Sequence, residues 1–209
     1  MRVSIIGSGN VATHIAKALK NANVTLLHIW SHNVENAEIL ANKVDAKAVE
    51  NISQISNDSD IVLISVKDDK ITAVSSQLHN YKGLIAHTSG AVAIDILASN
   101  ENYGVLYPLQ TFSKQKELDF SHIPLCLEAN SKANLNLLKQ LAKLISNSVY
   151  EVDSEQRKTL HLAAVFACNF PNYLYGIAQQ LLAKNQLDFD IIKPLITETA
   201  NKIQTALPM

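Results

Sequence analysis

The sequence predicts a doubly wound α/β fold with a mainly parallel sheet, followed by an all-helical C-terminal region. Up to residue 153, short β-prone runs alternate with helical segments, at the spacing typical of a parallel sheet covered on both faces. From Ser154 onward the pattern contains helical periodicity and no strand. We therefore expect an α/β domain at residues 1–153 and a helical domain at residues 154–209.

Each expected element follows from a local pattern. We expect strands near 3–6, 24–30, 46–49, 60–66, 83–87, 102–106, 123–128 and 149–152, and helices near 11–20, 34–43, 70–78, from 92 onward, 134–146, 154–182 and 190–206. The run at 60–66 is nearly all apolar and β-branched, as expected of a central strand buried on both faces. Asp68 or Asp69 can cap the helix that follows. Pro171 should kink or split the 154–182 helix after Phe170.

Composition excludes several classes of protein. Hydrophobic residues make up 47% and charged residues 18%, which is typical of a globular chain. A net charge of -1 gives no reason to expect nucleic acid or an anionic membrane as a partner. The chain opens directly on a core strand, and Cys126 and Cys168 lack metal-ligand spacing to another Cys or His. We therefore expect no signal peptide, no metal site and a reduced, cytoplasmic protein.

The N-terminal turn predicts a dinucleotide site. A short strand runs into Gly7-Ser8-Gly9-Asn10-Val11-Ala12 at the start of a helix. Gly7 permits a sharp turn, Gly9 has no Cβ to hold a pyrophosphate away from the backbone, and Ala12 lets the helix lie close to its strand. The phosphates would then bind the free N–H groups of the first helical turn, at the positive end of the helix dipole. We expect cofactor contacts from Gly7, Ser8, Gly9, Asn10 and Val11.

The other loops at the carboxyl ends of the strands should complete this site. Ser31, His32 and Asn33 follow the second strand without an acidic residue, which suits the 2′-phosphate of NADP better than the 2′-hydroxyl of NAD; a plain helix-capping turn is the alternative. Further along the chain we expect cofactor contacts from Val66, Lys67, Asp68 and His87, and substrate contacts from Thr88, Ser89, Gly90 and Gln110. Asp68 as a simple helix cap and His87 as a structural residue remain the alternatives.

A polar stripe on the 154–182 helix offers candidate catalytic groups. Lys158, His161 and Asn169 fall at helical spacing among apolar neighbours, so His161 and Asn169 should be buried. Packed over the cofactor, the stripe would supply a general acid or base (His161), a cation (Lys158) and an amide that orients a carbonyl (Asn169). The alternative is a helix that only hydrogen-bonds back to the sheet loops.

Four motifs together resemble a known family. Residues 7–12, His87-Thr88-Ser89-Gly90, residues 107–112 and the helix from Arg157 to Phe170 resemble a bacterial family of NADP oxidoreductases, in which a Rossmann-like domain precedes a C-terminal helical domain of unknown function. The N-terminal half is also similar to pyrroline-5-carboxylate reductase and the β-hydroxyacid dehydrogenases.

The chain departs from these relatives in three ways. It lacks the serine- and glycine-rich C-terminal segment of pyrroline-5-carboxylate reductase and the Lys-x-x-x-Asn pair of the β-hydroxyacid dehydrogenases. His32 stands where relatives often carry an arginine. The resemblance implies a cofactor and no particular substrate. It also implies a longer natural chain, because family members continue past Leu207-Pro208-Met209.

These observations predict an NADP-dependent oxidoreductase. It would transfer a hydride between the nicotinamide and a small carbonyl, imine or hydroxy-acid substrate. A non-catalytic NADP-binding sensor or regulatory protein is the alternative. Two or three helices cannot bury their apolar faces alone and must pack on the α/β domain, on a second subunit or on chain absent from this sequence. Of these, we expect a homodimer through residues 154–209.

Overall fold

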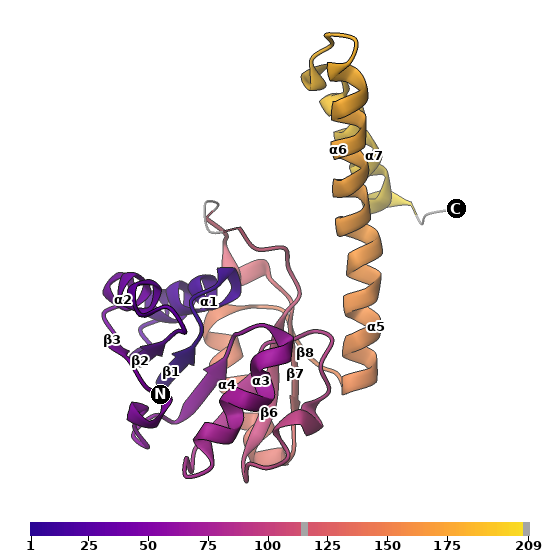
Figure 1. The fold of residues 1–209 in the computed structure, drawn as a ribbon. Coiled ribbons are helices and arrows are strands. Elements are labelled where there is room, and N and C mark those ends of the chain that lie inside the picture. The colour runs from indigo at the N-terminus through magenta and orange to yellow at the C-terminus, as the bar shows by residue number, and fades with distance from the viewer. Residues whose placement is uncertain (114–116, 207–209) are drawn as a thin grey trace. The chain divides into compact units, whose positions relative to one another are not determined.

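The computed structural model describes residues 1–113 and 117–206, and Leu207-Pro208-Met209, past which we expect the natural chain to continue, lie outside them. The described chain divides into two compact units, Met1–His161 and Leu162–Met209, each treated by itself below. The first unit has the expected α/β architecture, with helices on both sides of a sheet (Figure 1).

One eight-stranded sheet forms the centre of the first unit, in the order β3-β2-β1-β4-β5-β6-β7-β8. The strands are β1 (Arg2–Ile6), β2 (Thr25–Trp30), β3 (Lys47–Val49), β4 (Ile61–Ile64), β5 (Leu84–His87), β6 (Tyr103–Pro108), β7 (Leu125–Ala129) and β8 (Val149–Glu151). Pairing is parallel from β3 to β6 and between β7 and β8, whereas β6 and β7 pair antiparallel. The carboxyl ends of β1 to β6 therefore share one edge, and β8 ends at the opposite edge.

Helices cover both faces because alternate side chains of each buried strand point to opposite sides. Ile5 and Leu63 pack in the cluster that includes residues of α1 (Asn10–Asn21), α2 (Val34–Lys43) and α4 (Lys132–Ile145). Their strand neighbours Ile6 and Ile64 pack in the opposite cluster with α3 (Ile71–Ser75). The expected cap on the α3 segment is absent, because neither Asp68 nor Asp69 bonds to a backbone N–H there and Asp69 pairs with Lys70 instead.

One long helix runs from α5 (Ser154–Ala164) through a π-helical turn at Val165–Asn169 into α6 (Phe170–Ala183). The widened turn lies directly before Pro171, where the sequence predicts a kink or a split. Proline has no N–H to donate to the carbonyl four residues earlier in the helix. In the turn before Pro171, the N–H of Phe170 donates to the carbonyl of Val165, which is five residues earlier, as in a π-helix. The proline therefore changes the hydrogen-bond register of the helix without ending it.

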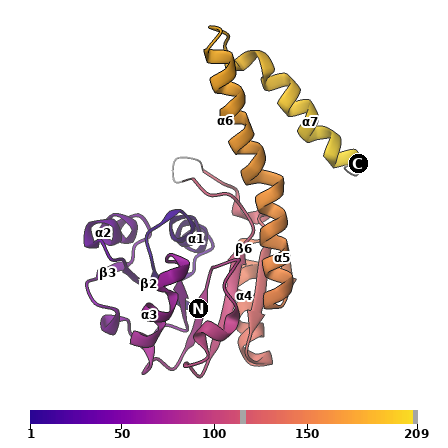
Figure 2. The same ribbon diagram turned by 45° about the vertical axis from the view of Figure 1, so that its right-hand side comes forward.

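In the second unit, α6 is joined through a 3₁₀ turn at Phe189–Ile192 to α7 (Lys193–Thr205), which runs back from the end of α6 (Figure 2). Neither α6 nor α7 contains a buried residue. Large apolar side chains are exposed along both, including Tyr173, Leu174, Leu181 and Leu195. Among the described residues, no helix is both long and apolar enough to cross a membrane.

Candidate functional site

A cavity of about 810 Å³ lies at the sheet edge where β1 to β6 end. Its wall includes the loops that the sequence predicted at this edge. Residues that line the cavity include Gly7, Ser8, Gly9, Asn10, Val11, Ser31, His32, Val66, Lys67, Asp68, Thr88, Ser89, Gly90, Tyr107, Gln110 and His161. All of these belong to the first unit. The sequence-based rule that ligands bind beyond the carboxyl ends of parallel strands therefore located the cavity.

Two glycines shape the part of the wall next to α1. Gly7 has a φ of +129°, and a Cβ there would lie 2.1 Å from the carbonyl oxygen of Ser65, so the fold itself requires glycine at this turn. Gly9 is the N-cap of α1, and a Cβ built on it meets no atom within 4 Å. Position 9 thus opens onto free space, where a side chain would stand between the backbone and a ligand.

The N-terminus of α1 carries no side chain that would compete with an anion. No side chain caps it, and its first turn contains no acidic residue. Ala12 is fully buried in the core cluster, as expected for a helix that lies close to its strand. The positive end of the α1 dipole, with the free N–H groups of the first turn, therefore lies at the cavity, and no acidic side chain of that turn neutralises it.

The end of β2 forms the adjoining wall. The Ser31 hydroxyl lies 2.7 Å from the Ser8 hydroxyl, which ties this strand end to the glycine turn. His32 is exposed and lines the cavity. Asn33, by contrast, accepts a hydrogen bond of 3.1 Å from the N–H of Asn36 and caps α2, so it does not reach the cavity wall. The capping alternative thus describes Asn33, and Ser31 and His32 are left as candidate ligand contacts.

The Thr88-Ser89-Gly90 segment is held tightly at the end of β5. Thr88 donates to the Ser65 hydroxyl at 3.1 Å, and the Ser89 hydroxyl accepts from the N–H groups of Ala91 and Val92 at 3.2 and 3.1 Å. A Cβ on Gly90 would lie 2.7 Å from Cζ of Tyr107 and 2.8 Å from Nδ1 of His161. Gly90 therefore gives these two side chains the space to meet.

His87 lies beneath the cavity wall and is not part of it. Its ring is fully buried, Nδ1 accepts from the N–H of Ser89 at 3.1 Å, and Nε2 has no partner among the described residues. Burial, with a further contribution from the nearby Arg157 cation, lowers the pKa of His87 to about 4. A neutral, inward-facing ring favours the structural alternative for this residue.

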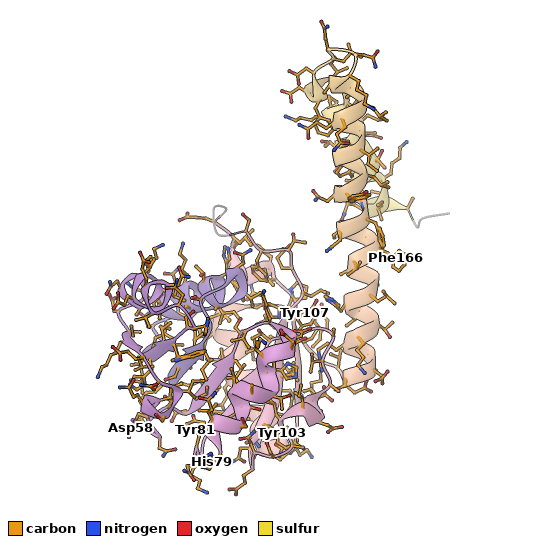
Figure 3. All side chains as sticks on the ribbon, in the orientation of Figure 1. Asp58, His79, Tyr81, Tyr103, Tyr107 and Phe166 are labelled. Atoms are coloured by element: carbon orange, nitrogen blue, oxygen red, sulfur yellow. The ribbon has the colours of Figure 1, made fainter. Side chains whose placement is uncertain are left out.

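Tyr107 and His161 form a hydrogen-bonded pair on the cavity wall. The Tyr107 hydroxyl lies 2.9 Å from Nδ1 of His161, and the rings meet edge to face with centroids 5.9 Å apart. Burial raises the pKa of Tyr107 to about 12. Figure 3 labels Tyr107, which comes from the cavity end of β6. Of this pair the sequence predicted His161 alone. The signal available for Tyr107 was its position at a strand end, in one of the motifs that carry the family resemblance.

A buried ion pair fixes the helix that carries His161. Arg157 is fully buried, pairs with Glu128 of β7 and donates to the carbonyl of Val92 at 2.6 Å. Ser154 adds a hydrogen bond of 2.8 Å to the same carboxylate. Because α5 begins after β8, at the edge opposite the cavity, it must run back toward the cavity. Arg157 anchors it one turn before His161.

This anchor corrects the expected polar stripe. Arg157 and His161 are four residues apart and face the first unit, whereas Lys158, about 100° further round the helix, points outward and pairs with Glu155 at 2.8 Å. Lys158 does not line the cavity. Asn169 belongs to the second unit, where it is exposed in the π-helical turn, and His161 is half-buried. The burial expected for Asn169 is not found in the single chain, where its apolar neighbours Leu162 and Phe166 are exposed as well.

Fold and site together define a Rossmann-like protein with a cavity of about 810 Å³ at the edge of its sheet. Family models agree: residues 1–111 match the Rossmann-like domain, and residues 123–209 match a domain of unknown function, DUF2520. The chain belongs to this two-part Rossmann-like and DUF2520 family, as the resemblance implied.

Solved structures extend this comparison. The putative NADP oxidoreductase BF3122 from Bacteroides fragilis is 40% identical, with a TM-score of 0.93 over 99% of this chain and 82% of that one. A 1-pyrroline-5-carboxylate reductase from Streptococcus pyogenes is 17% identical, with a TM-score of 0.76 over 100% of this chain and 82% of that one, and shares the fold. Both neighbours carry the names of oxidoreductases.

A curated relative matches at lower coverage. The glutamyl-tRNA reductase of Methanococcus aeolicus is 23% identical over 158 residues, which is 75% of this chain. The chain spans 39% of the length of that relative.

Proposed function

We propose that this chain binds NADP(H) in the 810 Å³ cavity and works as an oxidoreductase on a small carbonyl, imine or hydroxy-acid substrate. One observation carries the proposal: a single cavity joins the uncapped N-terminus of α1 to the Tyr107–His161 pair. The first is suited to a pyrophosphate and the second to proton transfer.

The residues near α1 support a dinucleotide as the ligand. Gly9 leaves the backbone open, and the first-turn N–H groups of α1 can donate to phosphate oxygens. Ser31 and His32 offer hydrogen-bond donors at the end of β2, where an NAD-specific site would carry an acidic residue. The NADP oxidoreductase name of the 40% identical structure supports the same preference.

The chemistry divides between cofactor and chain. Bound NADPH would supply the hydride. Reduction of C=O or C=N then also requires one proton on the oxygen or nitrogen, and His161, which lines the cavity, would supply it. The reverse reaction would return the proton to the same ring.

Cofactor binding is tested first, by thermal unfolding of the full chain with NADPH, NADP, NADH and NAD. A ligand that binds only the folded state adds about 2.7 kcal/mol to the free energy of unfolding when its concentration is a hundred times its dissociation constant. We expect NADPH and NADP to raise the melting temperature more than NADH and NAD do. The absence of a shift with all four would refute the proposal.

Gly9→Ala separates cofactor binding from folding. Because a Cβ at position 9 meets no protein atom within 4 Å, the variant should fold like the wild type. The methyl group would obstruct the phosphates, and loss of one hydrogen bond to a charged group, about 1.5–3 kcal/mol, weakens NADPH binding about tenfold or more. Gly176→Ala in α6 is the matched control, since its Cβ is equally free. Equal NADPH affinity in the two variants, measured by titration calorimetry, would place the phosphates elsewhere.

Turnover distinguishes an enzyme from an NADP-binding sensor. We expect loss of NADPH absorbance with at least one member of a panel of aldehydes, ketones, keto acids and imines. His161→Ala should abolish that activity while NADPH affinity stays the same. Tight NADPH binding with no turnover across the panel would favour the sensor.

A further inference from the structure

Tyr107 is placed to control the proton on His161. The residue is 8% exposed, and its hydroxyl lies 2.9 Å from Nδ1 of His161. Gly90 permits the contact between the two rings, because a side chain at position 90 would occupy the same space. All three residues belong to the first unit.

We infer that Tyr107 is a positioning residue that donates its hydroxyl proton to Nδ1 of His161 and so keeps the proton of the neutral ring on Nε2, facing the cavity. Its use in catalysis rests on the proposed function.

The direction of the hydrogen bond follows from what surrounds the hydroxyl. A buried tyrosine O–H needs an acceptor, and His161 is the side chain found within hydrogen-bond distance among the described residues. Burial raises the pKa of Tyr107 to about 12, so the hydroxyl keeps its proton at neutral pH and remains a donor. An Nδ1 atom that accepts this proton cannot carry one of its own, and a neutral imidazole then carries its proton on Nε2.

This tautomer selects a class of substrate. A carbonyl oxygen or imine nitrogen is a hydrogen-bond acceptor and suits an N–H donor, whereas a hydroxy acid about to be oxidised requires a lone pair to take its proton. The resting site therefore favours reduction of C=O or C=N. The Nε2–H group donates a hydrogen bond to the substrate oxygen or nitrogen that gains the proton, and the ring proton that it transfers is replaced from water. Tyr107 keeps its own proton throughout, because burial raises its pKa.

Tyr107→Phe tests the inference because it removes the hydroxyl and keeps the ring in place. The matched control is Tyr103→Phe, four residues earlier on the same face of β6 (Figure 3). No hydrogen bond of the Tyr103 hydroxyl is found within the described ranges. Thermal unfolding should show that both variants are folded.

The first readout is independent of activity. Nitrogen-15 NMR of the seven histidines distinguishes the two tautomers, and the His161 signals are assigned from those missing in His161→Gln. We expect the Nε2–H form in the wild type and in Tyr103→Phe, and a mixture of tautomers in Tyr107→Phe. A wild-type ring protonated on Nδ1, or a Tyr107→Phe spectrum equal to that of the wild type, would overturn the inference.

The second readout uses a substrate found by the turnover screen. Tyr107→Phe should lower kcat by about tenfold to a hundredfold with KM and NADPH affinity unchanged, because the lost interaction orients the proton donor and not the ligands. Gly90→Ala, which crowds the same pair, should lower kcat in the same way. If no substrate is found, the NMR result still decides the tautomer. Failure of the reductase proposal can therefore be distinguished from failure of the inference about Tyr107.

Discussion

At the scale of single residues, His87 shows how burial converts a common side chain into a pH-sensitive element of stability. His87 is the last residue of β5 and is fully buried. Burial lowers the pKa of its ring from 6.5 to about 4, so the ring is neutral in the folded protein at neutral pH. In the unfolded chain the same ring takes up a proton near pH 6.5. Between these pH values the unfolded state therefore binds more protons, and stability falls as the pH falls.

We expect this loss to amount to on the order of 3 kcal/mol between pH 6.5 and pH 4. His87→Asn should flatten the dependence, since an amide oxygen can accept from the N–H of Ser89 without titrating. The measurement is urea unfolding of both proteins at pH 5 and pH 7. His28, whose pKa burial also lowers, is present in both and so cancels. Parallel pH profiles for the two proteins would contradict the assignment.

Several residue roles could be predicted from the sequence, and others could not. The turn at Gly7 and the burial of Ala12 were predictable because a strand, a tight turn and the start of a helix follow one another within one short segment. The Tyr107–His161 contact joins residues 54 positions apart, and the inward orientation of Arg157 depends on Glu128, 29 positions earlier. Helical spacing alone fixes which residues share a face, but not which face points inward.

At the scale of elements, the Arg157–Glu128 pair attaches α5 to β7. Breaking a buried pair leaves an uncompensated charge and costs about 3–5 kcal/mol, whereas an exposed pair contributes about 0–1 kcal/mol. Arg157→Ala should therefore destabilise the protein by about 3–5 kcal/mol.

Lys158→Ala, which removes the neighbouring cation and its exposed pair with Glu155, should cost less than about 1 kcal/mol. Urea unfolding of both variants measures the difference. Equal losses of stability would mean that Arg157 does not anchor the helix.

The strands were the most predictable elements, and their directions were less so. Apolar runs and helix spacing located β1 to β8 within a few residues, because burial on both faces requires continuous apolar sequence. The antiparallel direction of β7 is not visible in such runs, since a strand reads the same in either direction. That direction decides that α5 starts at the edge opposite the cavity and returns to it.

At the scale of the whole molecule, the second unit exposes apolar side chains that a second copy of the chain would cover. We propose a homodimer through these helices, because α6 and α7 bury no residue of their own. Light scattering at micromolar concentration should give twice the 22.9 kDa of one chain.

A charge on this surface should disrupt the dimer. Leu181 is 58% exposed in the single chain, so Leu181→Glu should leave the fold intact and yield monomers. Gln180→Glu places the same charge at an exposed polar position of α6 and should remain dimeric. A monomeric wild-type chain would refute this assembly.

The Arg157–Glu128 pair and the Tyr107–His161 contact, one helical turn apart on α5, also determine how the chain tolerates changes in length. Each residue inserted into a helix turns everything beyond it by about 100° and advances it by about 1.5 Å. One alanine added after Lys158 would leave Arg157 on Glu128 and rotate His161 away from Tyr107. Natural variation in this family should accordingly allow many substitutions between positions 157 and 161 but no insertion or deletion there, because the phase of one helical turn brings His161 to the cavity.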